Sequence, residues 1–493
     1  MKQIQNCKSL AIGLTALFAL TLPVQASASF EDDKDKDKKE DEVEPVAEKD
    51  KDQYFLVHNA DIYTGTGTVL RSASLLSKNG KIVKIGYDIE APGRDYFKGI
   101  PEAEREFRLR SLDAQGMRVY PGIVAINSSG LPGTNGDFRD SVDPFSENMV
   151  LGLSTGITTT GVGRSAVKLK RYVSYEEPLP YDFDGIVLSD KTYASLSWTT
   201  SSSRRDAREK MSAARDYLNA YRTWQEEVKK DKELAEPEKK GVDSTYLEVL
   251  TGETYARFRA ADRASLLGIA RFAQEFGFRP IIIGCREGWI VADELGRAGA
   301  MAIVTARERR DKDERLSAEG GSSIENAAIL TKAGVQVAII PGSNGVDLGG
   351  IAGQDIMHLP VEVGFAIRGG LSEELAMASI STVPARMMGI SDRVGTLEVG
   401  KDCDLIVTDG DLLHYQTFVQ YTVVDGQLVY DKEEELYFAH IRPRPEKEIA
   451  PEEALDAGEN PPETKKVEEE EEEDEEGDDE DKPKDKEEGD DDK

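Results

Sequence analysis

Apolar strand-like runs alternate with helical stretches through the middle of this chain, and this alternation limits the fold more than any other feature. Short strands are expected near residues 119–124, 156–161, 185–188, 279–283, 302–304 and 335–340. Helices fit residues 146–154, 264–275, 289–298, 323–333 and 372–388. Such alternation is typical of a parallel sheet, open or closed, and a stretch of roughly 270 residues suits an eight-fold barrel. We therefore expect an α/β fold with a (β/α)8 TIM-like barrel over residues 119–390.

Strand signals also gather at both ends of this barrel region. The dipeptides Asn79-Gly80 and Asp425-Gly426 each lie between alternating strands, and both favour tight hairpin turns. We predict that residues 53–118 and 391–435 form one composite β-domain, a split β-sandwich built from both chain ends. Residues 203–242 are rich in Lys, Glu, Ala and Arg, which predicts an exposed helical insertion within the barrel.

The net charge of −32 is concentrated in two segments. Residues 451–493 hold 24 acids and 6 lysines, and residues 31–52 hold 12 acids and 6 lysines, which leaves −8 on the other 428 residues. Segments with so few apolar residues cannot offset the entropy of ordering. We predict an acidic disordered linker at 29–52 and an acidic disordered tail at 436–493. An acidic chain without a basic block is a poor candidate for nucleic-acid binding.

The first 28 residues have the features of a secretory signal peptide. Lys2 and Lys8 precede a 13-residue apolar run at 10–22, and Ala26-Ser27-Ala28 offers a cleavage site. A short membrane anchor is the alternative, although the run is short for a bilayer span. We expect export to a bacterial periplasm, and no membrane span after cleavage.

Three groups of motifs resemble the amidohydrolase superfamily, in particular its imidazolonepropionase-like branch. The first group runs from Gly80-Lys81-Ile82 to Tyr120-Pro121-Gly122, and the second is Gly152 to Thr159. The third and most specific joins Pro384-Ala385 to Val394-Gly395 and to Gly400-Lys401-Asp402-Cys403-Asp404-Leu405. The resemblance covers residues 53–432. It implies a metal-dependent barrel carrying a β-sandwich made from both chain ends.

The metal ligands that this resemblance implies are replaced in the present chain. The family's first strand ends in an Asp and two His, and the matching residues here are Ala125, Asn127 and Ser129. Arg257-Phe258-Arg259 occupies the place of a His strand, and Gly284-Cys285 the place of another His. Since an arginine cannot ligate a metal and the usual donors are imidazole and carboxylate, we expect no metal. A divalent cation such as zinc is expected only if an atypical centre exists.

The same alignment defines a set of residues that would ring the barrel mouth. They are Asn127, Ser129, Arg257, Arg259, Gly284, Cys285, Arg286, Gly342, Ser343 and Asn344. An arginine pair in a partly buried cleft suits a carboxylate or phosphate. Alternatively, these arginines pair with local acids such as Asp262, Glu287 or Asp347. Cys285 is either a nucleophile or, more commonly for a lone cysteine, a small buried hydrophobe.

Two functions of different class remain open from the sequence. One is an exported amidohydrolase-like protein that has lost metal-dependent catalysis and acts as a binding or structural module for a small anionic ligand. It would act alone, as a homo-oligomer, or with an active relative. The other is a hydrolase of C–N bonds other than peptide bonds, such as those of cyclic amides, with an atypical active centre.

Overall fold

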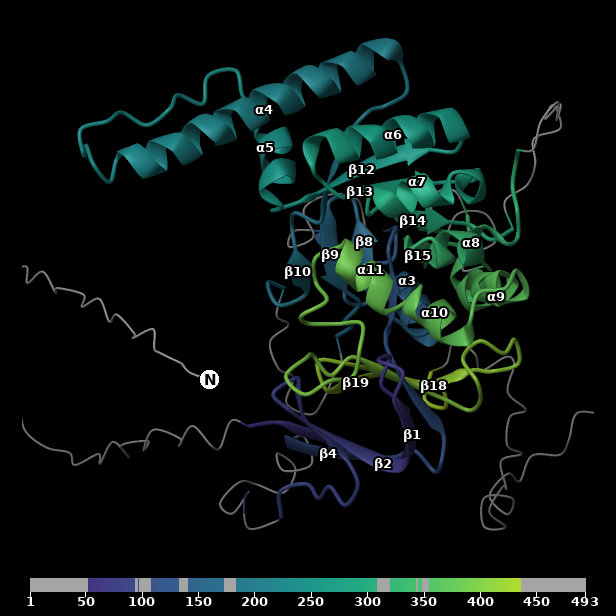
Figure 1. Cartoon of the computed structure of the whole chain (residues 1–493). Helices are drawn as coiled ribbons and strands as arrows, with labels where there is room; N and C mark the ends of the chain where they lie inside the picture. The colour runs from purple at the N-terminus through teal and green to yellow at the C-terminus, as the bar shows by residue number, and fades with distance from the viewer. Residues whose placement is uncertain are drawn as a thin grey trace, which may run out of the picture.

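The computed structural model describes most of the chain between its two charged ends. It covers residues 52–93, 96, 108–132, 141–172, 183–307, 320–342, 345–347 and 354–435. The predicted signal peptide, most of the predicted linker and the predicted tail lie outside these residues. No helix in the described ranges is long and apolar enough to cross a membrane. Figure 1 shows a β-domain at one end, a layer of strands and helices next to it, and a projecting helical arm.

One eight-stranded sheet combines strands from both ends of the described chain. Its strands are β1 (Tyr54–Tyr63), β2 (Val69–Lys78), β3 (Lys81–Gly86), β4 (Leu109–Asp113), β5 (Arg118–Pro121), β17 (Leu405–Thr408), β18 (Val419–Val424) and β19 (Gln427–Asp431). The order is β19-β18-β17-β5-β1-β2-β3, and β4 pairs with β1. The antiparallel pair of β17 and β5 joins the two chain ends, with Leu405 opposite Pro121. The described strands are connected in one hydrogen-bonded sheet, and its edge strand β3 meets the residues before β17, where the Ile82 amide donates to the Lys401 carbonyl at 2.8 Å. The split β-sandwich expected from the sequence stays a prediction.

The two predicted hairpin turns meet inside this sheet. Asn79, Gly80, Asp425 and Gly426 all have positive φ, as type I′ turns require. The amide of Cys403 donates to the Gly80 carbonyl at 2.7 Å, and the amide of Gly426 donates to the Cys403 carbonyl at 3.0 Å. The two turns, 345 residues apart in sequence, therefore lie in one domain on either side of Cys403.

The acidic segment before this sheet ends one residue earlier than predicted. Asp52, placed in the linker by the sequence analysis, is 9% exposed. Its Oδ2 lies 2.8 Å from Lys78 Nζ. The hydrogen bond from Lys78 holds the pKa of Asp52 at about 2. Asp52 therefore belongs to the β-domain.

The central layer contains three further ladders. Its strands are β6 (Ile123–Ala125), β7 (Ser128–Ser129), β8 (Ile157–Val162), β9 (Ser165–Lys168), β10 (Val187–Ser189), β11 (Tyr193–Ser195), β12 (Tyr255–Ala260), β13 (Pro280–Gly284), β14 (Met301–Val304), β15 (Gln336–Ile339) and β16 (Val346–Asp347). Strands β11 to β15 form one parallel sheet in chain order. A second sheet has the order β10-β9-β8-β6, and β16 pairs with β7.

Helices cover the outer face of the parallel sheet. The helices of the described residues are α3 (Glu147–Ser154), α4 (Ser201–Glu227), α5 (Ser244–Thr251), α6 (Arg263–Phe276), α7 (Ala292–Arg297), α8 (Asn326–Lys332), α9 (Gln354–Arg368), α10 (Glu373–Ala378) and α11 (Thr382–Met387), with a 3-10 turn at Gly288–Ile290. Of these, α6 packs against β12 and β13, and α8 and α9 pack against β15. Helix α6 begins at Asp262, whose side chain accepts from the Ser265 amide, and ends at Gly277 with positive φ. Its buried residues Leu266 and Phe272 share one core cluster with Phe258 of β12. The predicted α/β class is confirmed.

A continuous eight-stranded ring, expected for residues 119–390, is absent from the ladders of the described residues. Between β15 and β6 the backbone of another segment intervenes. The Ile339 amide donates to the Ser379 carbonyl at 3.2 Å, and the Val124 amide donates to the Ile380 carbonyl at 2.8 Å. Residues in and after α11 fill the inner face of the strands. One buried cluster joins them to strand residues; its α11 side is Ala385, Met387, Met388 and Ile390, and its strand side includes Val124, Ile126, Ile281, Ile283, Met301 and Ile303.

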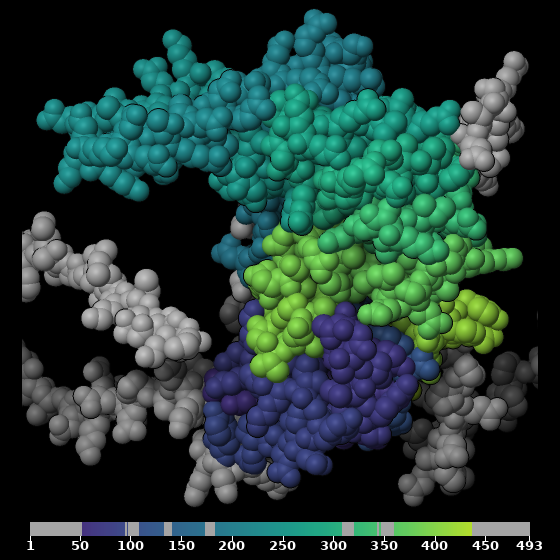
Figure 2. All heavy atoms as spheres, in the orientation of Figure 1, coloured from purple at the N-terminus to yellow at the C-terminus, as the bar shows by residue number. Residues whose placement is uncertain are grey.

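The insertion predicted at 203–242 contains one long helix. Helix α4 begins after Thr200 in a capping box with Ser203. Its first half is anchored by the buried residues Ala207, Met211, Ala214 and Tyr217. The rest of α4 and the segment after it project from the body of the molecule (Figures 1 and 2).

Candidate functional site

The sequence analysis placed Arg257 and Arg259 at the mouth of a barrel, and in the structure both belong to β12. Arg257 and Arg259 are two residues apart in the strand, so they face the same side of the sheet. Their neighbours Ala256, Phe258 and Ala260 are buried in the outer core. Arg257 is half-buried and Arg259 is exposed. The alternation in β12 therefore directs two cationic side chains away from the helices.

Arg257 rests on an aromatic ring of the neighbouring strand. Its Cζ lies 3.6 Å from the centroid of Tyr193 in β11. Its Nη2 donates to Ser195 Oγ at 3.2 Å, and the two residues are opposite each other in the parallel ladder. Burial and the nearby Arg259 lower the pKa of Arg257, although Tyr193 opposes this. No carboxylate pairs with Arg257 among the described residues.

The acids suggested as partners of these arginines are engaged elsewhere. Asp262 accepts from the Ser265 amide at 2.9 Å as the cap of α6. Glu287 accepts from the amides of Arg263 and Gly321, both at 2.8 Å. The side chain of Asp347, the third suggested acid, lies outside the described part of the structure. Both acids whose side chains are described therefore accept hydrogen bonds from backbone amides.

The end of β13 carries Gly284, Cys285 and Arg286 next to this arginine strand. Gly284 lies opposite Ala260, and the Cys285 amide donates to the Ala260 carbonyl at 2.7 Å. Positive φ at Gly284 and Cys285 breaks the alternation of the strand. The Cys285 side chain consequently turns into the outer core with 0% exposure. The sequence analysis expected this side chain at an open barrel mouth, and the structure does not place it there. Its environment is that of a small buried hydrophobe. Arg286 is half-buried.

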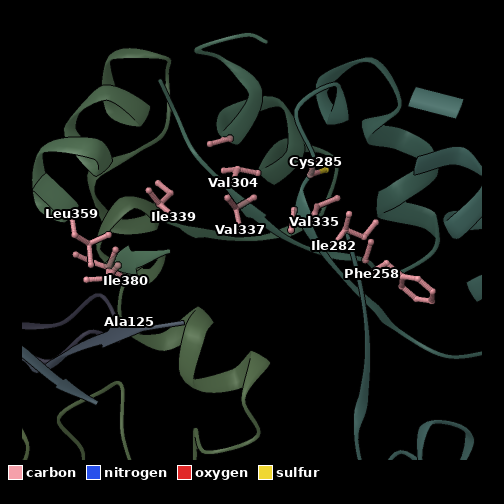
Figure 3. Close-up of a cluster of buried hydrophobic side chains, with 14 of the residues drawn as sticks. Ala125, Phe258, Ile282, Cys285, Val304, Val335, Val337, Ile339, Leu359 and Ile380 are labelled. Atoms are coloured by element: carbon pink, nitrogen blue, oxygen red, sulfur yellow. The ribbon is translucent and has the colours of Figure 1, made fainter. Parts of the chain in front are cut away.

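Three of the remaining candidate residues, Asn127, Ser129 and Gly342, lie at or next to the β7–β16 ladder. The Val346 amide donates to the Asn127 carbonyl at 2.8 Å, and the Gly345 amide donates to the Gly342 carbonyl at 3.0 Å. Ser129 is half-buried in β7. Ser343 and Asn344 lie outside the described residues. Figure 3 shows Ala125 at one end of the row of strands, and Phe258 and Cys285 at the other.

Two of the expected ligand positions carry side chains that offer no lone pair to a metal ion. Ala125 is buried and apolar, and Arg257 offers only N–H donors. Among the described residues, no group of three or more His, Cys, Asp or Glu could hold a metal ion. His58 lies in β1, His358 in α9 and His414 after β17; His440 is not described.

A second charged site, not predicted from the sequence, lies between the central layer and the β-domain. Lys168 at the end of β9 has no exposed side-chain area. Its Nζ lies 2.7 Å from Asp402 Oδ2 and 3.0 Å from Asp404 Oδ2, and it also pairs with Asp425. Two of these acids belong to the Gly400–Leu405 motif, and the third to the Asp425-Gly426 turn. We call these four residues the Lys168 cluster.

Burial and the neighbouring charges shift the pKa values of the residues in the Lys168 cluster. Burial raises the pKa of Asp404 to about 6, with Asp425 adding to it and Lys168 opposing it. Burial also opposes the ionisation of Asp402, but Lys168, Lys81 and Arg393 lower its pKa overall. Burial disfavours the charged form of Lys168, yet the three aspartates raise its pKa. Opposite charges in the cluster therefore stabilise one another at the junction between the central layer and the β-domain.

Comparison with known proteins identifies similar sequences and folds. Residues 350–430 match the Amidohydrolase family. The chain is 42% identical over 65 residues to an N-acetylglucosamine-6-phosphate deacetylase of Bos taurus, and 28% identical over 95 residues to the amidohydrolase tasK of Hapsidospora irregularis. These matches cover 13% and 19% of this chain and span only 15% and 10% of the two relatives.

One solved structure is similar over most of the described fold. An amidohydrolase from Thermotoga maritima MSB8 has a TM-score of 0.55 and 22% sequence identity. The alignment covers 77% of this chain and 100% of that one. The chain therefore has an amidohydrolase-type fold, and its last third carries the family's sequence motif.

Proposed function

We propose that this amidohydrolase-like protein is a binding module that holds a small anion at the ends of β11, β12 and β13 and has lost metal-dependent catalysis. The observation that carries the proposal is Arg257, a half-buried cation supported by Tyr193 and Ser195 where the family resemblance implies a metal ligand. Arg259 on the same strand face adds a second positive charge.

The chemistry of arginine favours an anionic ligand here. A guanidinium presents a planar set of N–H donors that matches a carboxylate or phosphate. A divalent cation within ~5 Å of the same group would be repelled by several kcal/mol at an effective dielectric constant of about 20. The charge that suits an anion therefore also disfavours the metal that hydrolysis would need.

A second function has its own support. The deacetylase of Bos taurus, which resembles this chain over 65 residues, is a hydrolase by name. On this alternative, the chain hydrolyses C–N bonds such as those of cyclic amides through an atypical centre. Export to a bacterial periplasm, homo-oligomer formation and pairing with an active relative are parts of the proposal that rest on the sequence alone.

Thermal unfolding in the presence of anions tests the binding site. Inorganic phosphate or acetate at about ten times its dissociation constant should stabilise the chain by about 1.4 kcal/mol. Arg257→Met should abolish this gain. Arg297→Met is the matched control, because Arg297 is an exposed arginine on α7 paired with Glu294. If both variants keep the full gain, the anion does not bind at Arg257.

A further inference from the structure

A cavity of about 220 Å³ lies between the β-domain and the last helices, away from the arginines of β12. Its wall combines the end of β1 and the turn after it, the end of β5, helix α10 and the segment after β17. Figure 2 shows the purple N-terminal strands meeting the light-green surface that follows α9 in the chain. The volume is below that of a drug-sized pocket, which suits a compact ligand.

The apolar wall of this cavity is rigidly built. Tyr63 and Tyr120 line it and stack with ring centroids 4.6 Å apart. The turn from Thr64 to Thr68 is closed by a bond from the Thr64 amide to the Thr68 carbonyl at 3.0 Å. The Leu397 amide then fixes this turn by donating to the Thr64 carbonyl at 2.8 Å. The wall is therefore in place before any ligand arrives.

The rim of the cavity carries an excess of negative charge. Glu373 and Glu374 line it, are exposed, and make no ion pair among the described residues. A Cβ atom on Gly67 would lie 3.1 Å from Glu374 Oε1, so this carboxylate faces the turn. The third acid, Asp411, is already paired with Arg118 at 2.7 Å. The carboxylates of Glu373 and Glu374 therefore make the rim of the cavity negatively charged.

We infer that this cavity binds a small organic cation, a primary amine with a compact apolar or aromatic body. The apolar part packs against Tyr63 and Met377, where burial of its surface drives binding. The ammonium group lies at the rim beside Glu373 and Glu374. Aromatic rings and carboxylates together are a favourable environment for such a cation. This inference does not depend on the anion site at Arg257.

Three probes of one shape test the inference on the full chain. Phenethylamine, the neutral phenethyl alcohol and the anionic 3-phenylpropionate are titrated by calorimetry or ligand-observed NMR. We expect saturable binding in the order amine, alcohol, anion. The double variant Glu373→Gln/Glu374→Gln should bind the amine about tenfold more weakly, because it removes both carboxylate charges from the rim. High salt should weaken amine binding in the wild type.

Control variants separate this cavity from the arginine site. Glu209→Gln removes an exposed acid on α4 and should leave amine binding unchanged. Ala378→Leu narrows the cavity and should weaken both the amine and the alcohol. Arg257→Met should have no effect on the amine. Equal affinity for amine and alcohol, an unchanged affinity in the double Gln variant, or a loss in Arg257→Met would each overturn the inference.

Discussion

Two cationic side chains of this molecule lie in opposite environments. Lys168 has no exposed side-chain area, and three aspartates surround its ammonium group. Arg257 is half-buried, and it contacts the aromatic ring of Tyr193 and the hydroxyl of Ser195. A buried charge that is fully compensated serves structure, whereas a cation without a carboxylate partner is available for an anionic ligand. On this difference we base the proposal that the junction serves stability and that Arg257 serves binding.

Removal of the Lys168 charge should have the largest effect on stability. Lys168→Met leaves three aspartates, of which Asp402 and Asp404 are buried, around an apolar side chain. Loss of one partner of a buried charge group costs about 3–5 kcal/mol. Lys191→Met breaks an exposed pair with Glu248 and should cost less than about 1 kcal/mol. Urea unfolding measures both values. A loss in Lys168→Met as small as that in Lys191→Met would show that the cluster does not hold the junction.

A change of pH should alter the stability of the folded chain through the ionisation of Asp404 at the same junction. Its pKa is about 6 in the folded chain and 3.8 ordinarily, so the folded state binds more protons between these pH values. Stability should therefore fall as pH rises from 4 to 6, by about 2 kcal/mol. Asp404→Asn cannot ionise and should lose this slope, while Asp392→Asn, an exposed control, should keep it. Identical slopes in the two variants would contradict the assignment to Asp404.

Deletion of the C-terminal tail should have the smallest effect. Residues 446–493 have almost no apolar side chains to contribute to a core. A chain ending at residue 445 should keep the melting temperature of the full chain within a degree or two, by calorimetry at the same salt concentration. A fall of more than several degrees would mean that the tail docks on the folded part.

Local chemistry explains what was predictable from the sequence. The turns at Asn79-Gly80 and Asp425-Gly426 require positive φ, which the residue types themselves favour, and both turns form as expected. Strand alternation likewise explains why Arg257 and Arg259 of β12 share one face. These features depend on a few consecutive residues, so they can be recognised without knowledge of tertiary contacts.

Long-range contacts explain what was missed. The bond from Lys168 to Asp404 joins residues 236 apart in sequence, and nothing local to Lys168 indicates it. The failure of the ladders to form one ring depends on Ser379 and Ile380, which intervene between β15 and β6. Cys285 was placed at an open mouth by the family alignment, but positive φ at Gly284 and Cys285 turns its side chain into the core.

The central claim is that the strand ends hold an anion-binding arginine instead of a catalytic metal. Elemental analysis of the full chain, purified without chelator, tests it most directly. We predict well under one equivalent of zinc, manganese or iron per chain, because Ala125 and Arg257 supply no lone pairs at the expected ligand positions. One tightly bound equivalent per chain, whose removal abolishes hydrolysis of a cyclic amide, would contradict the account and establish the hydrolase.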